Sequence, residues 1–185
     1  MGIIVTVTGG MRSGKSTFAE LLAKEKGGRD VLYIATMKPI DEECIERIKK
    51  HRDRRPKDWL TVEVYSDIDV VIARSGKKVG ILDCLTNMVS NIMMEIDLSW
   101  DNVTNDIIAD VGVRIREEIE KMVCRARENL DTFIVVTNEV GMGIIPDTKL
   151  GRIFTEYMGE VNKLLVELSD EVYFMISGIP LKIKG

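Results

Sequence analysis

The hydrophobic residues of this chain form short, nearly continuous runs that alternate with segments of helical periodicity. The runs are rich in β-branched residues and cover Ile3–Thr8, Val31–Ala35, Val79–Asp83, Phe133–Thr137 and Glu171–Ile176. Strands buried on both faces have this pattern, so it predicts a parallel sheet. The intervening segments are amphipathic and predict helices over Lys15–Lys26, Asp41–Asp53, Cys84–Ile96, Asn105–Asn129 and Gly151–Ser169. The alternation indicates an α/β protein that binds ligands at the carboxyl ends of its strands.

Three further segments complete the pattern. Leu60–Tyr65 alternates more strictly between apolar and polar residues and predicts an edge strand, and the tail Pro180–Gly185 predicts a short extra strand. Asp97–Asp106 is the most polar interruption, and we expect it to form a surface loop. Because the sequence contains no internal repeat, low-complexity tract or linker, residues 1–185 are expected to form a single domain.

The composition and charge of the chain disfavour several classes of binding partner. The chain has 185 residues, of which 45% are hydrophobic, and this length suits one domain with a substantial core. Its net charge of −4, from 26 Lys and Arg against 30 Asp and Glu, lacks the polycationic signature of nucleic-acid or acidic-membrane binding. No leader pattern precedes the first strand, and no apolar run approaches the roughly 18 residues of a membrane span. We therefore expect a cytoplasmic protein with no membrane span.

The cysteines do not follow a structural pattern. Cys44, Cys84 and Cys124 are odd in number and form no C-x-x-C pair. This spacing argues against both a disulfide framework and a zinc site. We expect three reduced and mostly buried thiols.

The residues Gly9 to Ser16 read G-x-x-x-x-G-K-S and join the first predicted strand to the first predicted helix. Strand, glycine loop and helix in this order form a phosphate-binding loop. Gly9 and Gly14 allow a close approach of the backbone, whose N–H groups stabilise the anion together with the helix N-terminus. We expect Lys15 to reach the outer phosphates and the hydroxyl of Ser16 to bind Mg²⁺. This strongest signal predicts a P-loop nucleotide-binding domain over residues 1–185.

A P-loop protein needs a second oxygen ligand for Mg²⁺, usually at the end of a neighbouring hydrophobic strand. Asp83 ends the run "VGILD" and is the candidate, although an Asp in this place also suits the N-cap of the following helix. The two roles are compatible. The sequence contains no N-K-x-D motif, which disfavours a guanine-specific switch GTPase.

The segment Arg47–Trp59 is strongly basic and holds the single histidine of the chain, His51. On a helix, Arg47, His51 and Arg54 or Arg55 share one face. A solvated helix face is the ordinary explanation of such a charge run. An imidazole among guanidinium groups is also what a nucleophile directed at phosphate requires, because the cations keep it neutral and stabilise charge on the attacked phosphate. The residues alone leave both interpretations open.

Several long motifs together resemble one enzyme family. "TGGMRSGKS", "YIAT", "DEECIERIKKHRDRRPKDWLTVE", "LDCLTNMVSN", "VTNEVGMGIIPDTKLGRIF" and "SGIPLKIK" occur in order over essentially the whole chain. They are similar to the adenosylcobinamide kinase/adenosylcobinamide-phosphate guanylyltransferase family of cobalamin biosynthesis. The resemblance implies a RecA-like P-loop NTPase fold, with a mostly parallel sheet flanked by helices, and a homotrimer.

The resemblance also implies a bifunctional transferase. Such an enzyme phosphorylates adenosylcobinamide with ATP or GTP, and then transfers GMP from GTP to adenosylcobinamide phosphate through a covalent guanylyl-histidine. The histidine of this sequence that matches is His51, so the implied catalytic residues are His51 and Lys15. Ser16 and Asp83 are expected to hold Mg²⁺. Nucleotide contacts are expected at Gly9, Gly10, Met11, Arg12, Ser13, Gly14, Lys15, Ser16, Thr17, Ala35, Thr36, Met37, Arg52, Asp53, Arg54, Arg55, Glu63 and Asp83.

Several other positions have an expected role that is structural or less specific. Glu63 also suits a solvent-facing strand residue. The segment "TNEVGMGIIP" is long for a connection and places Asn138 and Glu139 at a strand's carboxyl end, so a corrinoid or active-site role is expected there. The methionines of "CLTNMVSNIMM", Met88, Met93 and Met94, are expected to fill the core.

Two competing functions remain at this level. A P-loop small-molecule kinase would use the basic helix only to clamp phosphates. A nucleotide-binding regulatory or assembly subunit would hydrolyse ATP slowly and act through its surface. Transfer of a nucleotide from the α-phosphate of GTP to the protein separates the bifunctional enzyme from both.

Overall fold

The computed structural model describes residues 1–39, 42–97 and 99–185, without the side chains of residues 43, 44, 47, 50, 51 and 54. Strands and helices alternate along the chain, as the hydrophobic pattern predicts. Their bounds are β1 Ile3–Gly9, α1 Lys15–Gly27, β2 Val31–Ala35, α2 Glu42–Arg54, β3 Leu60–Glu63, α3 Ile68–Ser75, β4 Val79–Asp83, α4 Leu85–Met93, α5 Asn105–Asn129, β5 Thr132–Val136, α6 Lys149–Leu168, β6 Glu171–Ile176 and β7 Ile179–Lys184.

The described strands form one seven-stranded sheet in the order β3-β2-β4-β5-β1-β6-β7. Every neighbouring pair is parallel except β6 and β7, which are antiparallel. Strand β5 therefore lies between β1, which leads into the phosphate loop, and β4, which ends at Asp83. This arrangement confirms the expected α/β class with a mostly parallel sheet.

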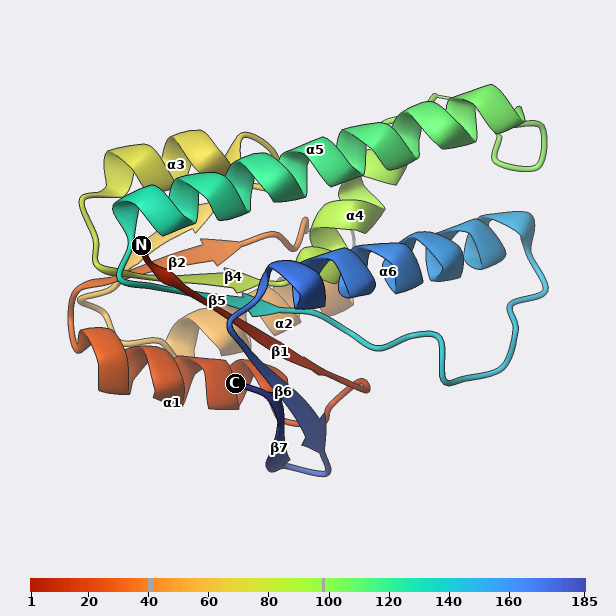
Figure 1. Ribbon diagram of the computed structural model, residues 1–185. Helices are drawn as coiled ribbons and strands as arrows, with labels where there is room; N and C mark the ends of the chain where they lie inside the picture. The colour runs from red at the N-terminus through yellow and green to blue at the C-terminus, as the bar shows by residue number, and fades with distance from the viewer. Residues whose placement is uncertain (40–41, 98) are drawn as a thin grey trace.

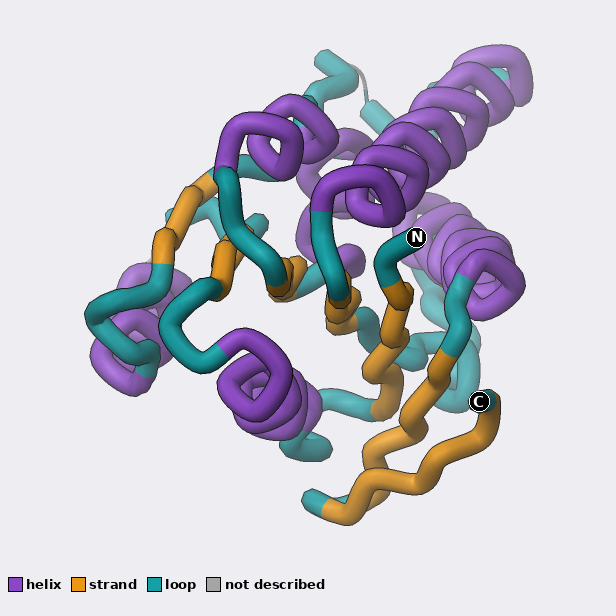
Figure 2. Tube along the Cα trace, turned by 60° about the vertical axis from the view of Figure 1, so that its left-hand side comes forward, coloured by secondary structure: helices purple, strands orange, loops and turns teal. Residues whose placement is uncertain are grey.

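Helices cover both faces of the sheet. Figure 1 shows α3, α4, α5 and α6 on one face and α1 and α2 on the other, and the end-on view in Figure 2 shows the sheet between the two layers. Successive side chains of a strand point to opposite faces. Accordingly Ile4 and Leu82 are buried in the core under α3 to α6, whereas Val5 and Ile81 are buried in the core under α1. Double-sided burial explains the near-continuous hydrophobicity of these strands.

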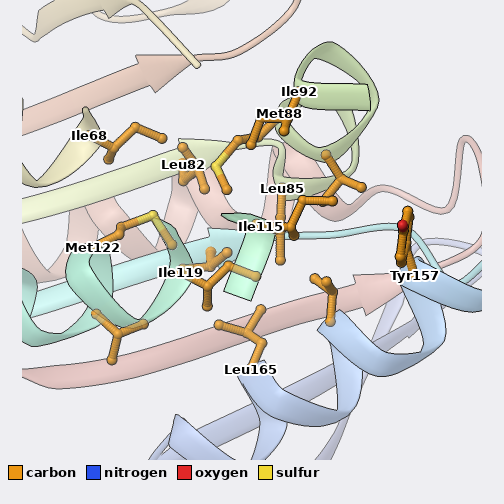
Figure 3. Packing of buried hydrophobic residues seen from close by; sticks show 14 of the residues in the cluster. Ile68, Leu82, Leu85, Met88, Ile92, Ile115, Ile119, Met122, Tyr157 and Leu165 are labelled. Carbon is orange, nitrogen blue, oxygen red and sulfur yellow. The ribbon is translucent and has the colours of Figure 1, made fainter. Parts of the chain in front are cut away.

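The larger core is built around α5 (Figure 3). Its buried residues recur every three or four positions and so form one apolar stripe: Val111, Ile115, Ile119, Met122, Val123 and Ala126. Ile68 and Ile72 of α3, Leu85 and Met88 of α4, and Leu165 of α6 are buried in the same cluster. Each such side chain contributes about 1.5–3 kcal/mol to folding through burial.

The structure corrects several details of the predicted pattern. Helix α3 was not predicted, because the short run Ile68–Ile72 has no clear period, although Gly76 ends it in a left-handed conformation (φ 61°). Helix α4 ends at Met93, short of Ile96, and Met94 is 53% exposed, so only Met88 and Met93 fill the core as expected.

The polar segment 97–106 is not simply a surface loop. Trp100 and Val103 are buried, and α5 begins within the segment at Asn105. Cys84 is buried as expected, whereas Cys124 is exposed. The side chain of Cys44 lies outside the described residues. Among the described helices, none is long and apolar enough to cross a membrane.

Candidate active site

The phosphate loop connects β1 to α1 at the carboxyl edge of the sheet. Gly9 and Gly14 have φ values of +146° and +93°, which side-chain-bearing residues rarely adopt. A Cβ at Gly9 would lie 2.6 Å from the carbonyl oxygen of Met175. Gly14 is the N-cap of α1, so the N-terminal N–H groups of this helix face the loop. The hydroxyl of Ser13 is buried in the loop and has no hydrogen-bond partner among the described residues.

Lys15 lies inside this loop. Its side chain is 7% exposed, and Nζ donates a hydrogen bond to the carbonyl oxygen of Gly10 at 2.6 Å. Burial lowers the pKa of Lys15, and the opposing influence of Cys84 and Asp83 only partly offsets this. A bound anion would compensate the burial of the ammonium group, so the loop is built for a charged ligand.

Asp83 receives two side-chain hydrogen bonds at the end of β4. Ser16 donates to Oδ1 at 3.2 Å, and the phenol of Tyr33 donates to Oδ2. The Ser16 hydroxyl and the Asp83 carboxylate are neighbouring hard oxygen donors, which is the chemistry that Mg²⁺ prefers. These residues fit the expected metal. Burial, followed by the charge of Asp83, raises the pKa of Tyr33 well above its usual range, so Tyr33 acts only as a hydrogen-bond donor.

Arg55, which directly follows α2, reaches the same place. Its guanidinium carbon lies 3.7 Å from the centroid of the Tyr33 ring, and Trp59 stacks near that ring with a centroid separation of 6.3 Å. Arg55 is 91% buried, yet its Nε has no hydrogen-bond partner among the described residues. A buried guanidinium with an unused donor at a cavity is suited to an anionic ligand.

The other predicted nucleotide-binding residues differ in position. Glu63 faces the cavity and forms an ion pair with Arg52, at the outer edge of the sheet. Asp53 is exposed and does not line the cavity. Thr36 is buried, and its Oγ1 both donates to the carbonyl of Cys84 and accepts from the N–H of Cys84, so its side chain holds β2 to β4.

His51 lies on α2, but its side chain and that of Arg54 are outside the described residues. Two α2-side residues that are described, Ile48 and Arg55, line the cavity. The helix that carries His51 therefore borders the cavity that contains the phosphate loop. The thiol of Cys84, also at the cavity, is buried, and burial raises its pKa to about 12, so it is protonated at neutral pH.

The cavity has a volume of about 620 Å³ and contains the phosphate loop, Asp83 and two contrasting walls. This volume is within the range of small-molecule sites. The nucleotide-side wall comes from β2, α2 and β3 and comprises Ala35, Met37, Ile48, Arg55 and Glu63. The amide wall comes from α4, the loop after β5 and α6, and comprises Thr86, Asn87, Asn138, Glu139, Val140 and Phe154.

Some of these residues escaped the sequence-based prediction. Thr86 and Asn87 follow Asp83 at the end of a buried strand, and the rule that ligands gather at strand carboxyl ends could have found them. Tyr33 and Phe154 gave no signal, because each is one apolar residue in an apolar pattern. Asn138 and Glu139 were expected at the site, and both line the cavity.

Comparison with known proteins finds similar sequences over nearly the whole chain. The family model described as cobinamide kinase / cobinamide phosphate guanyltransferase matches residues 5–183. The chain is 38% identical, over 98% of its length and 100% of theirs, to the bifunctional adenosylcobalamin biosynthesis proteins CobU of Escherichia coli strain K12 and Salmonella typhimurium strain LT2. The flagellar accessory protein FlaH from Methanocaldococcus jannaschii aligns with a TM-score of 0.46 and 14% identity, over 99% of this chain and 78% of FlaH.

Proposed function

The chain belongs to the cobinamide kinase / cobinamide phosphate guanyltransferase family, and from this premise we propose that one cavity serves both reactions. In the first, adenosylcobinamide receives the γ-phosphoryl group of ATP or GTP. In the second, GMP from GTP is joined to adenosylcobinamide phosphate, giving adenosylcobinamide-GDP. The observation that carries the proposal is the meeting of the phosphate loop with the α2 side in one cavity of about 620 Å³.

The kinase reaction is assigned to the phosphate loop. The backbone N–H groups at the start of α1 and the buried hydroxyl of Ser13 bind phosphate oxygens, and Lys15 stabilises the charge of the transferring group. Ser16 and Asp83 are the candidate ligands of Mg²⁺, which when bound neutralises the phosphates. Tyr33 holds the Asp83 carboxylate in place.

The guanylyl transfer is assigned to His51. A bond forms between an imidazole nitrogen and the α-phosphorus of GTP, while the bond to pyrophosphate breaks and pyrophosphate leaves. A phosphate oxygen of adenosylcobinamide phosphate then attacks the same phosphorus and displaces the imidazole. The family resemblance and the position of α2 beside the cavity support this role. Arg55 and Glu63, which line the nucleotide-side wall, and Arg52, which pairs with Glu63, are assigned to GTP.

Covalent labelling tests the second reaction. Incubation with α-labelled GTP and Mg²⁺ should leave label on the denatured chain, stable in base and labile in acid. The variant His51→Asn should acquire no label and release no adenosylcobinamide-GDP, but should still make adenosylcobinamide phosphate. Label on His51→Asn would remove His51 from the mechanism. Loss of both activities would support a kinase in which His51 clamps phosphate.

We also propose that residues 1–185 act as one P-loop domain in a cytoplasmic homotrimer. The family resemblance supports the trimer. Sedimentation velocity should give three times the chain mass of 20.9 kDa, and a monomeric mass at micromolar concentration would contradict it.

A further inference from the structure

The loop after β5 begins at a chemically important point of the sheet. Val136, at the end of β5, is level with Val7 of β1 on one side and with Asp83 of β4 on the other. The next residues, Asn138 and Glu139, therefore lie between the phosphate loop and the metal-binding carboxylate. Both line the cavity. A phosphoryl group held between Lys15 and Asp83 would face this loop.

The backbone here is fixed on several sides. The N–H of Asn138 donates to Thr86 Oγ1 of α4 at 2.8 Å, and its carbonyl accepts from Asn162 Nδ2 of α6 at 3.0 Å. The N–H of Glu139 donates to the carbonyl of Gly9 at 3.0 Å. These hydrogen bonds tie the start of the loop to two helices and to the phosphate loop.

The polar side chains of Asn87, Asn138 and Glu139, by contrast, make few hydrogen bonds within the described structure. Within residues 1–39, 42–97 and 99–185, no hydrogen bond engages the side-chain amides of Asn87 and Asn138. Glu139 Oε1 accepts from the N–H of Gly141 at 2.9 Å, and its Oε2 has no partner in the same ranges. A rigid backbone that presents unpaired polar groups to a cavity is the arrangement of a binding site.

We propose that the amide wall is the acceptor subsite of the kinase reaction and that Glu139 is its general base. This inference rests on the proposed function. The acceptor hydroxyl loses its proton to the Glu139 carboxylate as its oxygen forms a bond to the γ-phosphorus. The bond from that phosphorus to the β,γ-bridging oxygen breaks, and the nucleoside diphosphate leaves.

The other carboxylates at the cavity have different partners. Asp83 is held by Ser16 and Tyr33, and Glu63 pairs with Arg52 on the nucleotide-side wall. Glu139 is the carboxylate of the amide wall, so it is the acid–base group on the side where an acceptor can approach the outer phosphate.

The remaining groups of the wall match the chemistry of the acceptor. Cobinamide presents carboxamide side chains around a largely apolar ring. Asn87 and Asn138 each offer an amide donor and acceptor to such groups. Val140 and Phe154, both half-buried at the cavity, offer apolar contact. An acceptor lacking the amides would leave the two asparagines unpaired, which discriminates against it.

Glu139→Gln is the central test, because it keeps the side-chain shape and the oxygen that accepts from Gly141 but removes the basic group. Its kcat for phosphorylation of cobinamide should fall roughly 10²- to 10⁴-fold. Its KM for ATP, its melting temperature and its labelling by α-labelled GTP should match the wild type. Glu156→Gln, an exposed position on α6 away from the cavity, is the matched control and should keep full activity.

The split between kcat and the KM for ATP is a readout that a merely structural role would not give, because a disturbed fold would also weaken ATP binding. A kcat for Glu139→Gln within threefold of wild type would overturn the role of Glu139.

Asn87→Ala and Asn138→Ala test the subsite independently. Each should raise the KM for cobinamide about tenfold while leaving the KM for ATP unchanged, as expected for one lost hydrogen bond of about 1.5 kcal/mol. Unchanged cobinamide KM values in both variants would overturn the subsite. The proposed function fails by a different result, in which the wild type itself forms no adenosylcobinamide phosphate.

Discussion

At the scale of single residues, the burial of Lys15 links nucleotide binding to stability. Because burial lowers its pKa, the folded protein holds the proton of Lys15 less tightly than the unfolded chain does. At any pH below the pKa of Lys15 in the unfolded chain, about 10.4, the charged side chain therefore opposes folding. A bound phosphate reverses this by supplying the opposite charge.

The variant Lys15→Ala should consequently lose kinase turnover without losing stability. Its melting temperature without nucleotide should stay within about 4 °C of wild type at neutral pH, because the lost hydrogen bond to Gly10 is offset by removal of a buried charge. The stabilisation that Mg-ATP gives the wild type should largely disappear. Differential scanning fluorimetry with and without nucleotide measures both, and an undiminished ATP-induced shift would contradict the role of the loop lysine.

Tyr33 gives a second prediction at this scale. Tyr33→Phe keeps the ring beneath Arg55 but removes the hydrogen bond that orients Asp83. The Mg²⁺ concentration for half-maximal kinase activity should rise roughly tenfold, as is common when a partner of a metal ligand is lost. Binding of Mn²⁺ to the ATP complex, followed by electron paramagnetic resonance, should weaken in parallel.

The control for this variant is Tyr173→Phe. Tyr173 donates to Glu171 on β6, outside the cavity, so its loss should leave the metal dependence unchanged. Equal Mg²⁺ requirements in Tyr33→Phe and wild type would show that Asp83 does not need Tyr33.

At the scale of secondary-structure elements, close packing at Gly80 fixes how β4 lies against β5. A Cβ there would lie 2.8 Å from Phe133 Cδ2 and 2.9 Å from Leu130 Cδ1. Gly80→Ala should therefore destabilise the protein by about 1–3 kcal/mol through overpacking. Gly159→Ala is the opposite case, because Gly159 lies within α6 and a Cβ there meets no atom within 4 Å in the described structure. It should stabilise by about 0.5–1 kcal/mol.

Urea denaturation measures the free energy of unfolding of each variant, which should fall for Gly80→Ala and rise for Gly159→Ala. Both substitutions add one methyl group, so a difference between them isolates the effect of the surroundings. Equal stability of Gly80→Ala and wild type would mean that β4 and β5 shift apart at little cost.

The elements also show how far the sequence predicts this fold. The five central strands were predicted within one residue at each end, because burial on both faces leaves an uninterrupted apolar run. Helix α3 was missed because its run is short and its identity depends on packing against α5, with which Ile68 shares one buried cluster. The burial of Trp100 in a polar segment was unpredictable for the same reason, since tertiary contact alone decides it.

The site likewise divides into residues that a local sequence pattern identifies and residues whose roles depend on tertiary contacts. The phosphate loop and Asp83 were identifiable, because glycines, lysine and a strand-ending carboxylate occupy a fixed spacing. Tyr33 and Phe154 were not, since their roles depend on which atoms the fold brings near them. Asn138 could be placed at the edge of the sheet but not between β1 and β4, because strand order is not encoded in local periodicity.

At the scale of the whole molecule, Asp170 joins elements from both ends of the chain. Its Oδ2 accepts from the N–H of Ile4 at 2.7 Å and pairs with Arg127 of α5 at 3.0 Å. Arg127 also donates to the carbonyl oxygens of Gly2 and Leu168. Burial alone would raise the pKa of Asp170, but the hydrogen bond from Ile4 and the charge of Arg127 outweigh it and lower the pKa.

Asp170→Asn should therefore lower stability in a pH-dependent way. A carboxylate with a depressed folded-state pKa stabilises the protein above its unfolded pKa of about 3.9, and this contribution is lost as pH falls through the lower folded value. The urea midpoint of the variant should lie below that of wild type at pH 7, and the gap should narrow as the pH falls below 4. A gap independent of pH would assign the effect to shape rather than charge.

The anchoring of Asn138 and Glu139 also bears on how such an enzyme changes over evolutionary time. Thr86, Asn162 and Gly9 fix the chain before the segment 140–147 begins, and Thr148 caps α6 directly after it. The segment thus connects two anchored points of the chain. A lineage can lengthen, shorten or replace it while the residues of the phosphate loop are retained. Within the segment, Val140 lines the cavity, so a change of length there can alter the apolar contact with the acceptor while Asn87 and Asn138 keep their positions.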